Sequence, residues 1–491
     1  MTPKLRATFS SVFEECDLNL GDLHLPSLPP SSVNISSHEV GDVLRRLKKG
    51  SPGPDGIPFW IFRDHYDLLT PAVHHICSLS LTSGVFPDLL KSANVIPIPK
   101  QSKGASIEYR PISLLPTLSK VLEKIVLRKF LPGLIPGLGP RQFAFIPRQG
   151  QGTVSALTYI VNKILSHLDT PGAVRLLMID YSKAFDKLSH KSIIDALASL
   201  KAPVQLCSWI KSYLYLRKQR VKINDNFSEW YVASSGVPQG GVLSPFLFAV
   251  TVNDLEASFE NSLLVKFADD MCILHFVRSL NNNRLSEEFQ HIKQWSSKRG
   301  LHINCQKTKL MDFITNKSIK FPPLIDIDSN CTVEVVSQAK LLGLILDDKL
   351  SWVPHLEDVV SKVRKRMFFL HTLKQIKAPE HIFRSVYTSL IRSVSSYAYP
   401  AWCNIGFCAM KKMVSLERRV GKMFNFAPIV AFDSFCEQNA SRLAEKALDP
   451  DHPLHRIADH KASKFSARRR KSHRKVLAKT CRFGNSFIRF A

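Results

Sequence analysis

The chain has 491 residues, and its 67 lysines and arginines outnumber 41 acidic residues, which gives a formal net charge of +26. Hydrophobic residues make up 45% and charged residues 22%, ordinary values for globular proteins that argue against wholesale disorder. The length suffices for two to four domains with a sizeable core, so folding needs neither disulfides nor structural metals. The positive charge predicts a polyanionic partner, either nucleic acid or an anionic membrane surface.

The apolar segments are too short for a membrane span. The run 243–252 is far below the ~20 residues that cross a bilayer, and Glu14 and Asp17 fall where a signal peptide would be apolar. We therefore expect no membrane attachment and an intracellular location, in the nucleus, the cytoplasm or both. The ten cysteines are scattered, and Cys403 and Cys408 lack a nearby Cys/His pair that would complete a zinc site, so we expect reduced thiols.

The N-terminal third predicts helices around one strand. Residues 1–40 show little periodicity, and an amphipathic segment follows at 37–47. Apolar residues recur at three- and four-residue steps in 66–82 and 112–130, which predicts two helices. Between them, 95–100 reads as a strand that ends in a basic loop.

The middle of the chain predicts alternating helices and strands. Residues 174–179 form a mostly apolar strand that ends at Asp180. Turn formers at 236–241 separate a strand at 229–233 from a helix at 244–258. We predict helices at 153–168, 191–200, 204–216 and 244–258, and strands at 219–223 and 229–233.

Two short apolar strands, 263–267 and 271–276, are separated only by Ala268-Asp269-Asp270. This spacing predicts a hairpin with two carboxylates at its tip. The rest of the chain is expected to be a helix at 284–299, strand-like residues at 333–346 and a mainly helical region at 352–450. Residues 461–491 hold 11 Lys/Arg and no Asp or Glu.

Asp180, Asp269 and Asp270 are the candidate catalytic residues. Each could be a solvated strand end, but adjacent acids at a tight turn repel each other unless a cation lies between them. Three carboxylates from adjoining strands provide hard oxygen ligands suited to Mg²⁺. A pair of such ions can stabilise the attacking and leaving oxygens of an in-line displacement at phosphorus. With the net charge of +26, this favours a nucleotide substrate on a nucleic-acid template.

Five segments resemble reverse transcriptases. Residues 179–186 (IDYSKAFD) resemble their first catalytic motif, 235–245 (SGVPQGGVLSP) their Gly-Pro-Gln-Gly motif, and 267–270 (FADD) their Tyr/Phe-x-Asp-Asp motif. Residues 109–115 (YRPISLL) and 300–308 (GLHINCQKT) resemble conserved segments before and after these. The order and spacing of the five segments also fit. Their residues are most similar to those of reverse transcriptases from non-LTR (LINE-type) retrotransposons of the jockey group.

The resemblance runs from about residue 40 to 350 and continues more weakly to about 460. It implies an α+β right-hand polymerase with fingers, an antiparallel-sheet palm and a helical thumb. The implied division is an N-terminal extension at 1–40, fingers at 41–170 with part of the segment after 186, palm at 171–350, thumb at 351–450 and a basic tail at 451–491.

The implied activity is that of an RNA-directed DNA polymerase, a nucleotidyltransferase. Asp180, Asp269 and Asp270 would hold two Mg²⁺ ions, which Mn²⁺ can replace, while the primer 3′-hydroxyl attacks the α-phosphate of a dNTP and pyrophosphate leaves. The resemblance assigns metal binding most directly to Asp180 and Asp269, and it adds the backbone carbonyl of Tyr181 as a further metal ligand. Phe185 matches the steric gate that excludes a ribose 2′-hydroxyl, although by itself it reads as a core aromatic.

The other implied substrate contacts are mostly cationic. Arg110 matches the fingers arginine that contacts the triphosphate, where its fork suits phosphate oxygens. Lys100 or Lys103 would supply a second cation, and a solvated basic loop is the alternative. Gln239 matches a residue of the nucleotide and template pocket. Lys307 matches a lysine proposed to protonate pyrophosphate, although Lys309 lies close by.

Two further regions are assigned by the same resemblance. Residues 341–343 resemble the primer-grip hairpin, and the basic helix at 361–373 falls where the thumb would contact phosphates. The cluster 468–471 (RRRK) could bind RNA, act as a nuclear localisation signal or be a plain solvated tail.

The implied partners are an RNA template, a DNA primer, dNTPs and the RNA of the element itself. Too few residues precede the fingers to hold the endonuclease that such elements carry upstream, so we expect a nick to be made by another protein or by another part of a longer reading frame. Two alternatives stay open: a catalytically silent descendant that only binds RNA, and another templated polymerase such as a group II intron maturase or an RNA-dependent RNA polymerase.

Overall fold

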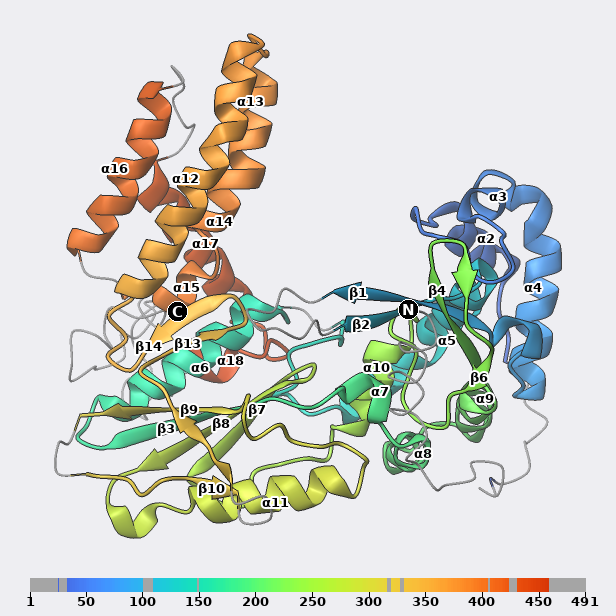
Figure 1. The fold of residues 1–491 in the computed structure, drawn as a ribbon, viewed down its shortest axis with the longest axis horizontal. Helices are drawn as coiled ribbons and strands as arrows, with labels where there is room; N and C mark the ends of the chain where they lie inside the picture. Colours follow the sequence, from blue (N-terminus) through green and yellow to red (C-terminus); the bar gives the residue numbers. More distant parts are fainter. Residues whose placement is uncertain are drawn as a thin grey trace, which may run out of the picture. The chain divides into compact units, whose positions relative to one another are not determined.

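The computed structural model describes residues 25, 33–99, 109–147, 150–315, 319–326, 331–404, 407–423 and 431–458. The chain divides into two compact units, which are described separately. The first unit comprises Met1–Ile146, Tyr181–Leu255 and Ile292–Ile303, and the second comprises Pro147–Asp180, Glu256–His291 and Asn304–Ala491. Both units mix helices with mainly antiparallel sheets (Figure 1), which confirms the α+β class.

The first unit is built on helices that bury one face. α2 begins with a capping box in which the Ser36 hydroxyl accepts from the Glu39 amide and the Glu39 carboxylate accepts from the Ser36 amide. Val40, Val43 and Leu44 are the buried stripe of α2, which packs against three other helices of the unit, α3, α4 and α5. The helices are α2 (Ser37–Arg45), α3 (Phe59–Asp64), α4 (Tyr66–Ser83), α5 (Thr117–Leu134), α7 (Ala184–Lys187), α8 (His190–Ser199), α9 (Val204–Leu214) and α10 (Ser244–Thr251), with 3-10 turns η2 (Asp88–Leu90) and η3 (Ile135–Gly137).

The sheet of the first unit has the strand order β2-β1-β4-β5, with β6 paired to β4. Its strands are β1 (Ala93–Pro99), β2 (Tyr109–Leu114), β4 (Lys218–Ile223), β5 (Asn226–Phe227) and β6 (Tyr231–Val232). β1 is antiparallel to β2 and parallel to β4. Only Tyr231–Val232 of the predicted strand 229–233 pairs in the sheet.

Two predicted helices differ from the structure by more than two residues at an end. The segment 112–130 was expected to be helical throughout, but Ile112 pairs with Ile96 of β1, and α5 begins only after Pro116. The pairing with a distant strand overrides the local helical periodicity. α10 stops at Thr251 rather than at residue 258, and Asn253 instead bonds Gly137 and Gly139 through its side chain.

The second unit contains the sheet β12-β9-β3-β8-β7. The central β3 is antiparallel to both β8 and β9, and α6 packs on the sheet (Figure 1). Val174, Leu176 and Leu177 of β3 are completely buried. The elements are α6 (Thr153–Leu168), β3 (Ala173–Ile179), β7 (Ser262–Phe267), β8 (Asp270–Val277), η4 (Leu280–Asn282), β9 (Lys309–Ile314), β10 (Ile325–Asp326), β11 (Cys331–Thr332), β12 (Glu334–Val335), β13 (Gln338–Leu341) and β14 (Leu344–Asp347); α11 (Leu285–Ser297) is shared between the units.

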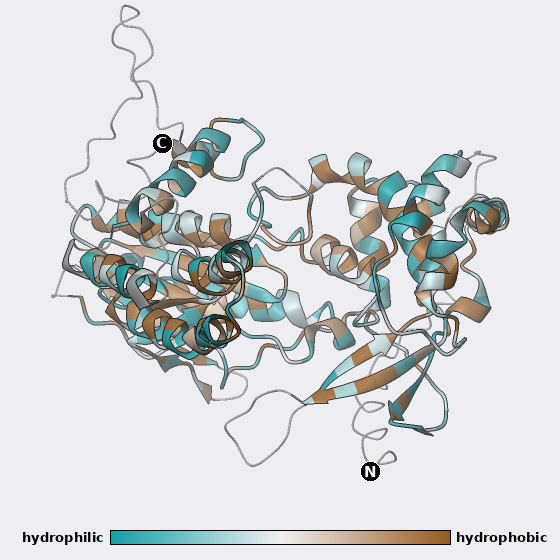
Figure 2. Ribbon diagram, turned by 90° about the horizontal axis from the view of Figure 1, so that it is seen from above, coloured by the Kyte–Doolittle hydropathy of each residue, from teal (hydrophilic) through white to brown (hydrophobic). Residues whose placement is uncertain are grey.

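The region after β14 is mainly helical, as the sequence predicts. Many of its helices carry hydrophobic residues on one side and hydrophilic residues on the other (Figure 2). On α12, Arg364 and Lys365 are exposed, Lys362 pairs with Asp358, and Arg366 donates to the Leu390 carbonyl. The helices are α12 (Val353–Gln375), α13 (Glu380–Val386), the π-helical η5 (Tyr387–Arg392), α14 (Ser393–Ser395), α15 (Tyr399–Trp402), α16 (Phe407–Met423), α17 (Phe432–Lys446) and α18 (His455–Ala458).

Among the described residues, every helix is too short or too polar to cross a lipid bilayer. The described cysteines are free, and most of them are buried: Cys77, Cys207, Cys272, Cys305, Cys331, Cys403 and Cys436. The side chain of Cys408 and the cluster 468–471 lie outside the described residues, so both predictions stay open.

A buried ion pair crosses the sheet of the second unit. Arg175 of β3 lies opposite Asp312 of β9, its Nε donates to the aspartate at 2.9 Å, and its guanidinium lies 4.3 Å from the centre of the Phe321 ring. Asp312→Ala is expected to lower the free energy of unfolding by about 3–5 kcal/mol because it strands a buried cation. Amide hydrogen exchange in β3 measures the loss. The double variant Arg175→Met/Asp312→Leu should lose much less, and an equal loss would contradict the explanation.

Candidate active site

A cavity of about 500 Å³ in the second unit brings together three residues that the sequence singled out. Asp180 directly follows β3, and Asp270 is the first residue of β8. Because Ile179 pairs with Met271 in antiparallel register, the two aspartates emerge at the same end of the sheet. Both line the cavity, together with Lys307.

The β7–β8 hairpin is tighter than predicted. Phe267 pairs with Asp270, so the loop contains only Ala268 and Asp269. Ala268 has φ +56°, the left-handed value that two-residue hairpin turns require at their first position. A residue other than glycine held there costs on the order of 1 kcal/mol, and such strain is concentrated at functional sites.

The three aspartates act on one another electrostatically. Asp270 is exposed at the hairpin tip, but its surroundings shield the carboxyl from part of the solvent. This partial burial, with the negative charges of Asp269 and Asp180, raises the pKa of Asp270 to about 6. A cation would relieve the repulsion between these groups.

The donor set suits Mg²⁺ held partly by substrate. Nowhere in the described part of the chain do three or more acidic, histidine or cysteine side chains stand close enough to hold a metal ion by themselves. Mg²⁺ in phosphoryl-transfer sites is usually held by one or two carboxylates plus substrate phosphates, so the all-oxygen pair Asp180 and Asp270 fits this chemistry without a closed cage.

The segment before β9 fixes the position of Asp180. The Asn304 amide donates to the Asp180 carbonyl at 2.8 Å, and the Asp180 amide donates to the buried Thr308 hydroxyl at 3.3 Å. Lys307 lies within this segment and is exposed at the cavity. Lys309 also lines the cavity, but it forms an ion pair with Glu334 of the neighbouring strand. Both Lys307 and Lys309 therefore place a cation at this cavity.

The β13–β14 hairpin forms another wall of this cavity through Leu341 and Leu342. Its two loop residues, Leu342 and Gly343, both have positive φ, +45° and +90°. The Tyr397 hydroxyl donates to the Leu342 carbonyl at 2.7 Å, and its ring lies 3.3 Å from where a Cβ on Gly343 would be. Tyr397 therefore holds the hairpin tip, a role that no sequence motif indicated.

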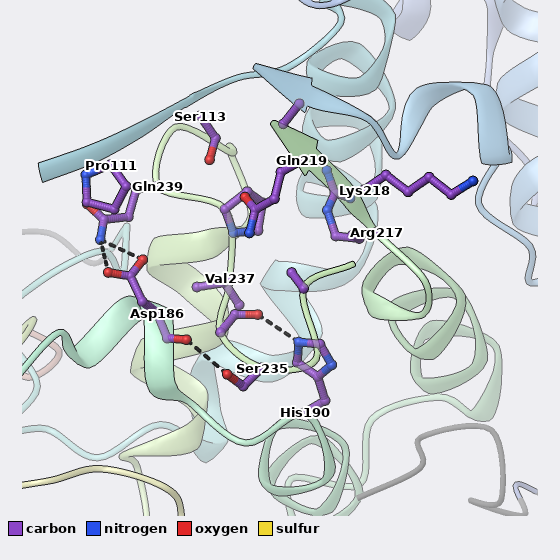
Figure 3. Close-up of a pocket in the computed structure, with 14 residues that line it drawn as sticks. Pro111, Ser113, Asp186, His190, Arg217, Lys218, Gln219, Ser235, Val237 and Gln239 are labelled. Carbon is purple, nitrogen blue, oxygen red and sulfur yellow. Dashed lines mark hydrogen bonds between the residues drawn. The ribbon is translucent and has the colours of Figure 1, made fainter. Parts of the chain in front are cut away.

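In the first unit, the glycine-rich loop 235–243 carries Gln239 (Figure 3). The Gly236 amide donates to the Leu188 carbonyl, and the Val237 amide donates to the Phe185 carbonyl, both at 2.8 Å. The Gly236 carbonyl lies 2.8 Å from Nε2 of His190. Burial lowers the pKa of His190 to about 4, so a neutral imidazole donates this bond at neutral pH. The loop is thus fastened along one side to the segment that carries Phe185.

A buried glutamate fastens the other end of the loop. Glu123 of α5 is completely buried and accepts the amides of Val242 and Leu243 and the hydroxyl of Ser119. Burial raises the pKa of Glu123, against the effect of these donors. The donors sit at the start of α10, where a carboxylate is favoured by the helix dipole. Sequence reasoning missed Glu123, because a lone acid in an amphipathic helix gives no signal.

Phe185 and Gln239 belong to the same cluster of the first unit. The half-buried Phe185 ring stacks on Phe248 with ring centres 4.8 Å apart. The Gln239 side-chain nitrogen donates to both carboxylate oxygens of Asp186, at 2.8 and 2.9 Å (Figure 3). Asp186 was not singled out from the sequence, although it follows Phe185 directly in the first motif.

The remaining predicted site residues lie as follows. Arg110 is exposed on β2. The Tyr181 side chain is buried, and its hydroxyl is bonded to Ser296, so only its backbone could serve a ligand. Lys100 and Lys103 lie outside the described residues. Arg110, Tyr181, Phe185 and Gln239 belong to the first unit, and Asp180, Asp269, Asp270 and Lys307 to the second.

Comparison with known proteins finds one family. Residues 98–346, about half of the chain, match the family described as "Reverse transcriptase (RNA-dependent DNA polymerase)". The chain is 28% identical over 414 residues to the "Probable RNA-directed DNA polymerase from transposon BS" of Drosophila melanogaster, covering 79% of this chain and 44% of that protein. It is 29% identical to the "RNA-directed DNA polymerase from mobile element jockey" of the same species, covering 70% and 38%, and 26% identical to the protein of that name from Drosophila funebris, covering 88% and 48%. The chain thus spans less than half the length of these relatives.

Proposed function

Because the chain belongs to the reverse transcriptase (RNA-dependent DNA polymerase) family, we propose that it is the RNA-directed DNA polymerase of a non-LTR retrotransposon and extends a primer 3′-hydroxyl with dNTPs. The observation that carries the proposal is the cavity that Asp180, Asp270 and Lys307 line together. A nucleoside triphosphate needs carboxylates to hold its metal ions and a cation to bind its phosphates. This cavity offers both. The relatives named for mobile elements support the assignment to a retrotransposon.

The roles in the cavity follow from charge. Asp180, Asp270 and the neighbouring Asp269 would hold two Mg²⁺ ions, for which Mn²⁺ can substitute. The bound ions would make the primer hydroxyl more acidic and neutralise charge on the triphosphate. Lys307 would bind the leaving pyrophosphate and supply its proton. The hairpin tip held by Tyr397 would support the primer end.

The residues of the first unit would select the nucleotide. The Phe185 ring, supported by Phe248, would occlude a ribose 2′-hydroxyl, and Arg110 would bind phosphate oxygens bidentately. Gln239 would contact the nucleotide or its template partner, and Lys100 would add a second cation. The backbone carbonyl of Tyr181 would complete the set as an additional metal ligand.

The finer architecture belongs to the same proposal. We assign fingers to 41–170 with part of the segment after 186, palm to 171–350 and thumb to 351–450. The exposed Arg364 and Lys365 of α12 support phosphate contacts by the thumb region. The expected partners are an RNA template, a DNA primer and the RNA of the element. The proposed location is intracellular, in the nucleus or cytoplasm, and the nick that supplies a primer would come from an endonuclease elsewhere.

The test is primer extension on a poly(rA) template with oligo(dT), dTTP and Mg²⁺. Extension that requires the three aspartates would support the proposal. A folded chain that binds RNA but does not extend the primer would instead indicate a silent RNA-binding descendant. A preference for UTP over dTTP would indicate an RNA-dependent RNA polymerase.

Nucleotide selection gives a second, sharper result. Phe185→Val is expected to reduce the preference for dTTP over UTP by at least about tenfold, because a smaller side chain leaves room for the 2′-hydroxyl. The ratio of kcat/KM for the two nucleotides measures this preference. Phe248→Leu is the matched control, since it disturbs the same ring stack from the buried side and should leave the ratio nearly unchanged. An equal change in both variants would make Phe185 a packing residue only.

A further inference from the structure

We propose that Asp186 is a positioning residue that orients the side-chain amide of Gln239, so that its carbonyl oxygen, and not its NH2 group, faces the substrate. The inference rests on the proposed function, in which Gln239 contacts the nucleotide or its template partner. It assigns a role to the last residue of the first motif, which was not itself expected to act.

The contact between the two side chains is close and shielded from water. The Gln239 nitrogen lies 2.8 Å from one carboxylate oxygen of Asp186 and 2.9 Å from the other (Figure 3). Asp186 is only 4% exposed, whereas Gln239 is half-buried. A charge-assisted hydrogen bond is stronger than a neutral one, and shielding from water strengthens it further.

The chemistry of a carboxylate decides which end of the amide points inward. An ionised carboxylate accepts hydrogen bonds and donates none, so it pairs with the NH2 group of glutamine and repels its carbonyl oxygen. The carbonyl oxygen of Gln239 must then point away from Asp186. A group that meets Gln239 from the open side therefore encounters an acceptor, which selects a hydrogen-bond donor on the nucleotide or the template.

Both residues are held by their backbones, so the side-chain contact has little freedom. The Asp186 carbonyl accepts from the Ser235 hydroxyl at 3.1 Å, and the Asp186 amide donates to the Lys183 carbonyl at 2.9 Å. The Gln239 carbonyl accepts from the Ser113 amide at 2.7 Å. Because the loop backbone is fixed at both ends of the contact, the carboxylate controls mainly the side-chain torsions of Gln239.

Asp186 acts through Gln239 rather than on the substrate itself. The pocket that Asp186 and Gln239 line together has a volume of about 20 Å³, which is room for about one water molecule and not for a nucleotide. The pocket is closed in by Ser113, His190 and Arg217 (Figure 3). A substrate can therefore reach the outer side of Gln239, while Asp186 stays behind it.

A double-mutant cycle tests the inference by steady-state extension. Asp186→Ala is expected to raise the KM for dTTP by about tenfold or more in the parent chain, and by less than threefold in a chain that already carries Gln239→Ala. Asp186→Asn is the matched variant of equal size. Its side chain can donate as well as accept, so it allows either amide orientation and should raise KM nearly as much as Asp186→Ala. Equal effects in both backgrounds, or full rescue by Asp186→Asn, would overturn the inference.

A second readout does not depend on activity. In protein labelled with ¹⁵N-glutamine, Gln239→Ala identifies the side-chain amide signals of Gln239, and Asp186→Ala should shift them and speed their exchange with water. Unchanged signals would overturn the inference even if KM rises.

A parent chain that binds dTTP but extends no primer would contradict the proposed function alone. The dissociation constant for dTTP then replaces KM in the same cycle, and additive effects there would again overturn the positioning role.

Discussion

Asp269→Ala/Asp270→Ala is expected to lower Mg²⁺-dependent primer extension by roughly 10³-fold or more, the scale seen when a charge-stabilising group is removed from a transition state. The same variant should keep its fold. Both carboxylates are exposed at a hairpin tip and repel each other and Asp180, so their removal relieves strain instead of creating it. We therefore expect a thermal unfolding midpoint that is unchanged or slightly raised.

The first unit offers a matched control for this result. In the β4–β5 hairpin, Ile223 pairs with Asn226, so Asp225 occupies the second position of a two-residue loop, as Asp269 does. The residue before it, Asn224, has φ +53°, close to the +56° of Ala268. Asp225→Ala removes one exposed charge from the same kind of turn and should leave extension within about twofold of the parent. If Asp225→Ala reduced extension as much as Asp269→Ala/Asp270→Ala, a general loss of turn stability would explain the result better than catalysis.

Gly236→Ala is expected to lower the free energy of unfolding by about 3 kcal/mol or more and to abolish extension with it. Gly236 has φ +76°, which is strained for any residue with a Cβ. An added Cβ would lie only 2.3 Å from the Asp186 carbonyl oxygen and 2.7 Å from its Cα. These are backbone atoms that no side-chain rotation can move away, so the loop that carries Gln239 must shift. Amide hydrogen exchange across 235–243 measures the loss locally.

A second glycine provides the control for this substitution. Gly133 lies inside α5, and nothing is within 4 Å of a Cβ added there. Gly133→Ala should stabilise the protein by about 0.5–1 kcal/mol, because alanine loses less conformational entropy in a helix than glycine does. If Gly236→Ala were tolerated equally well, the close approach between the loop and Asp186 would not exist in solution.

Much of the secondary structure follows from local patterns. The helix predicted at 153–168 has the same bounds in the structure, because its apolar residues recur with helical periodicity over four turns and a glycine precedes it. The strand that ends at Asp180 and the strands around Ala268 and Asp269 are also where alternation and turn residues place them. These helices and strands depend on residues that are only a few positions apart, so a short segment of the sequence is enough to predict them.

The two largest errors in helix bounds depend on partners farther away in the chain than one helical turn. Residues 112–114 are apolar enough for a helix, but their pairing with β1 satisfies the backbone as a strand. The segment after Thr251 leaves the helix where the Asn253 side chain bonds residues more than a hundred positions earlier. Local periodicity cannot reveal such a partner.

The same reason separates the parts of the candidate site. Residue types and spacing were enough to single out Asp180, Asp269 and Asp270, and the resemblance of the motifs to reverse transcriptases added Phe185 and Gln239. Their supports came only from the tertiary structure: Asp186 meets Gln239 across 53 positions, Glu123 meets Val242 across 119, and Tyr397 meets Leu342 across 55. A supporting residue is defined by what it contacts, and a buried acid or a tyrosine has no pattern of its own. By itself the sequence therefore determined the family and the candidate reacting groups, while the folded chain decided which residues hold those groups in place.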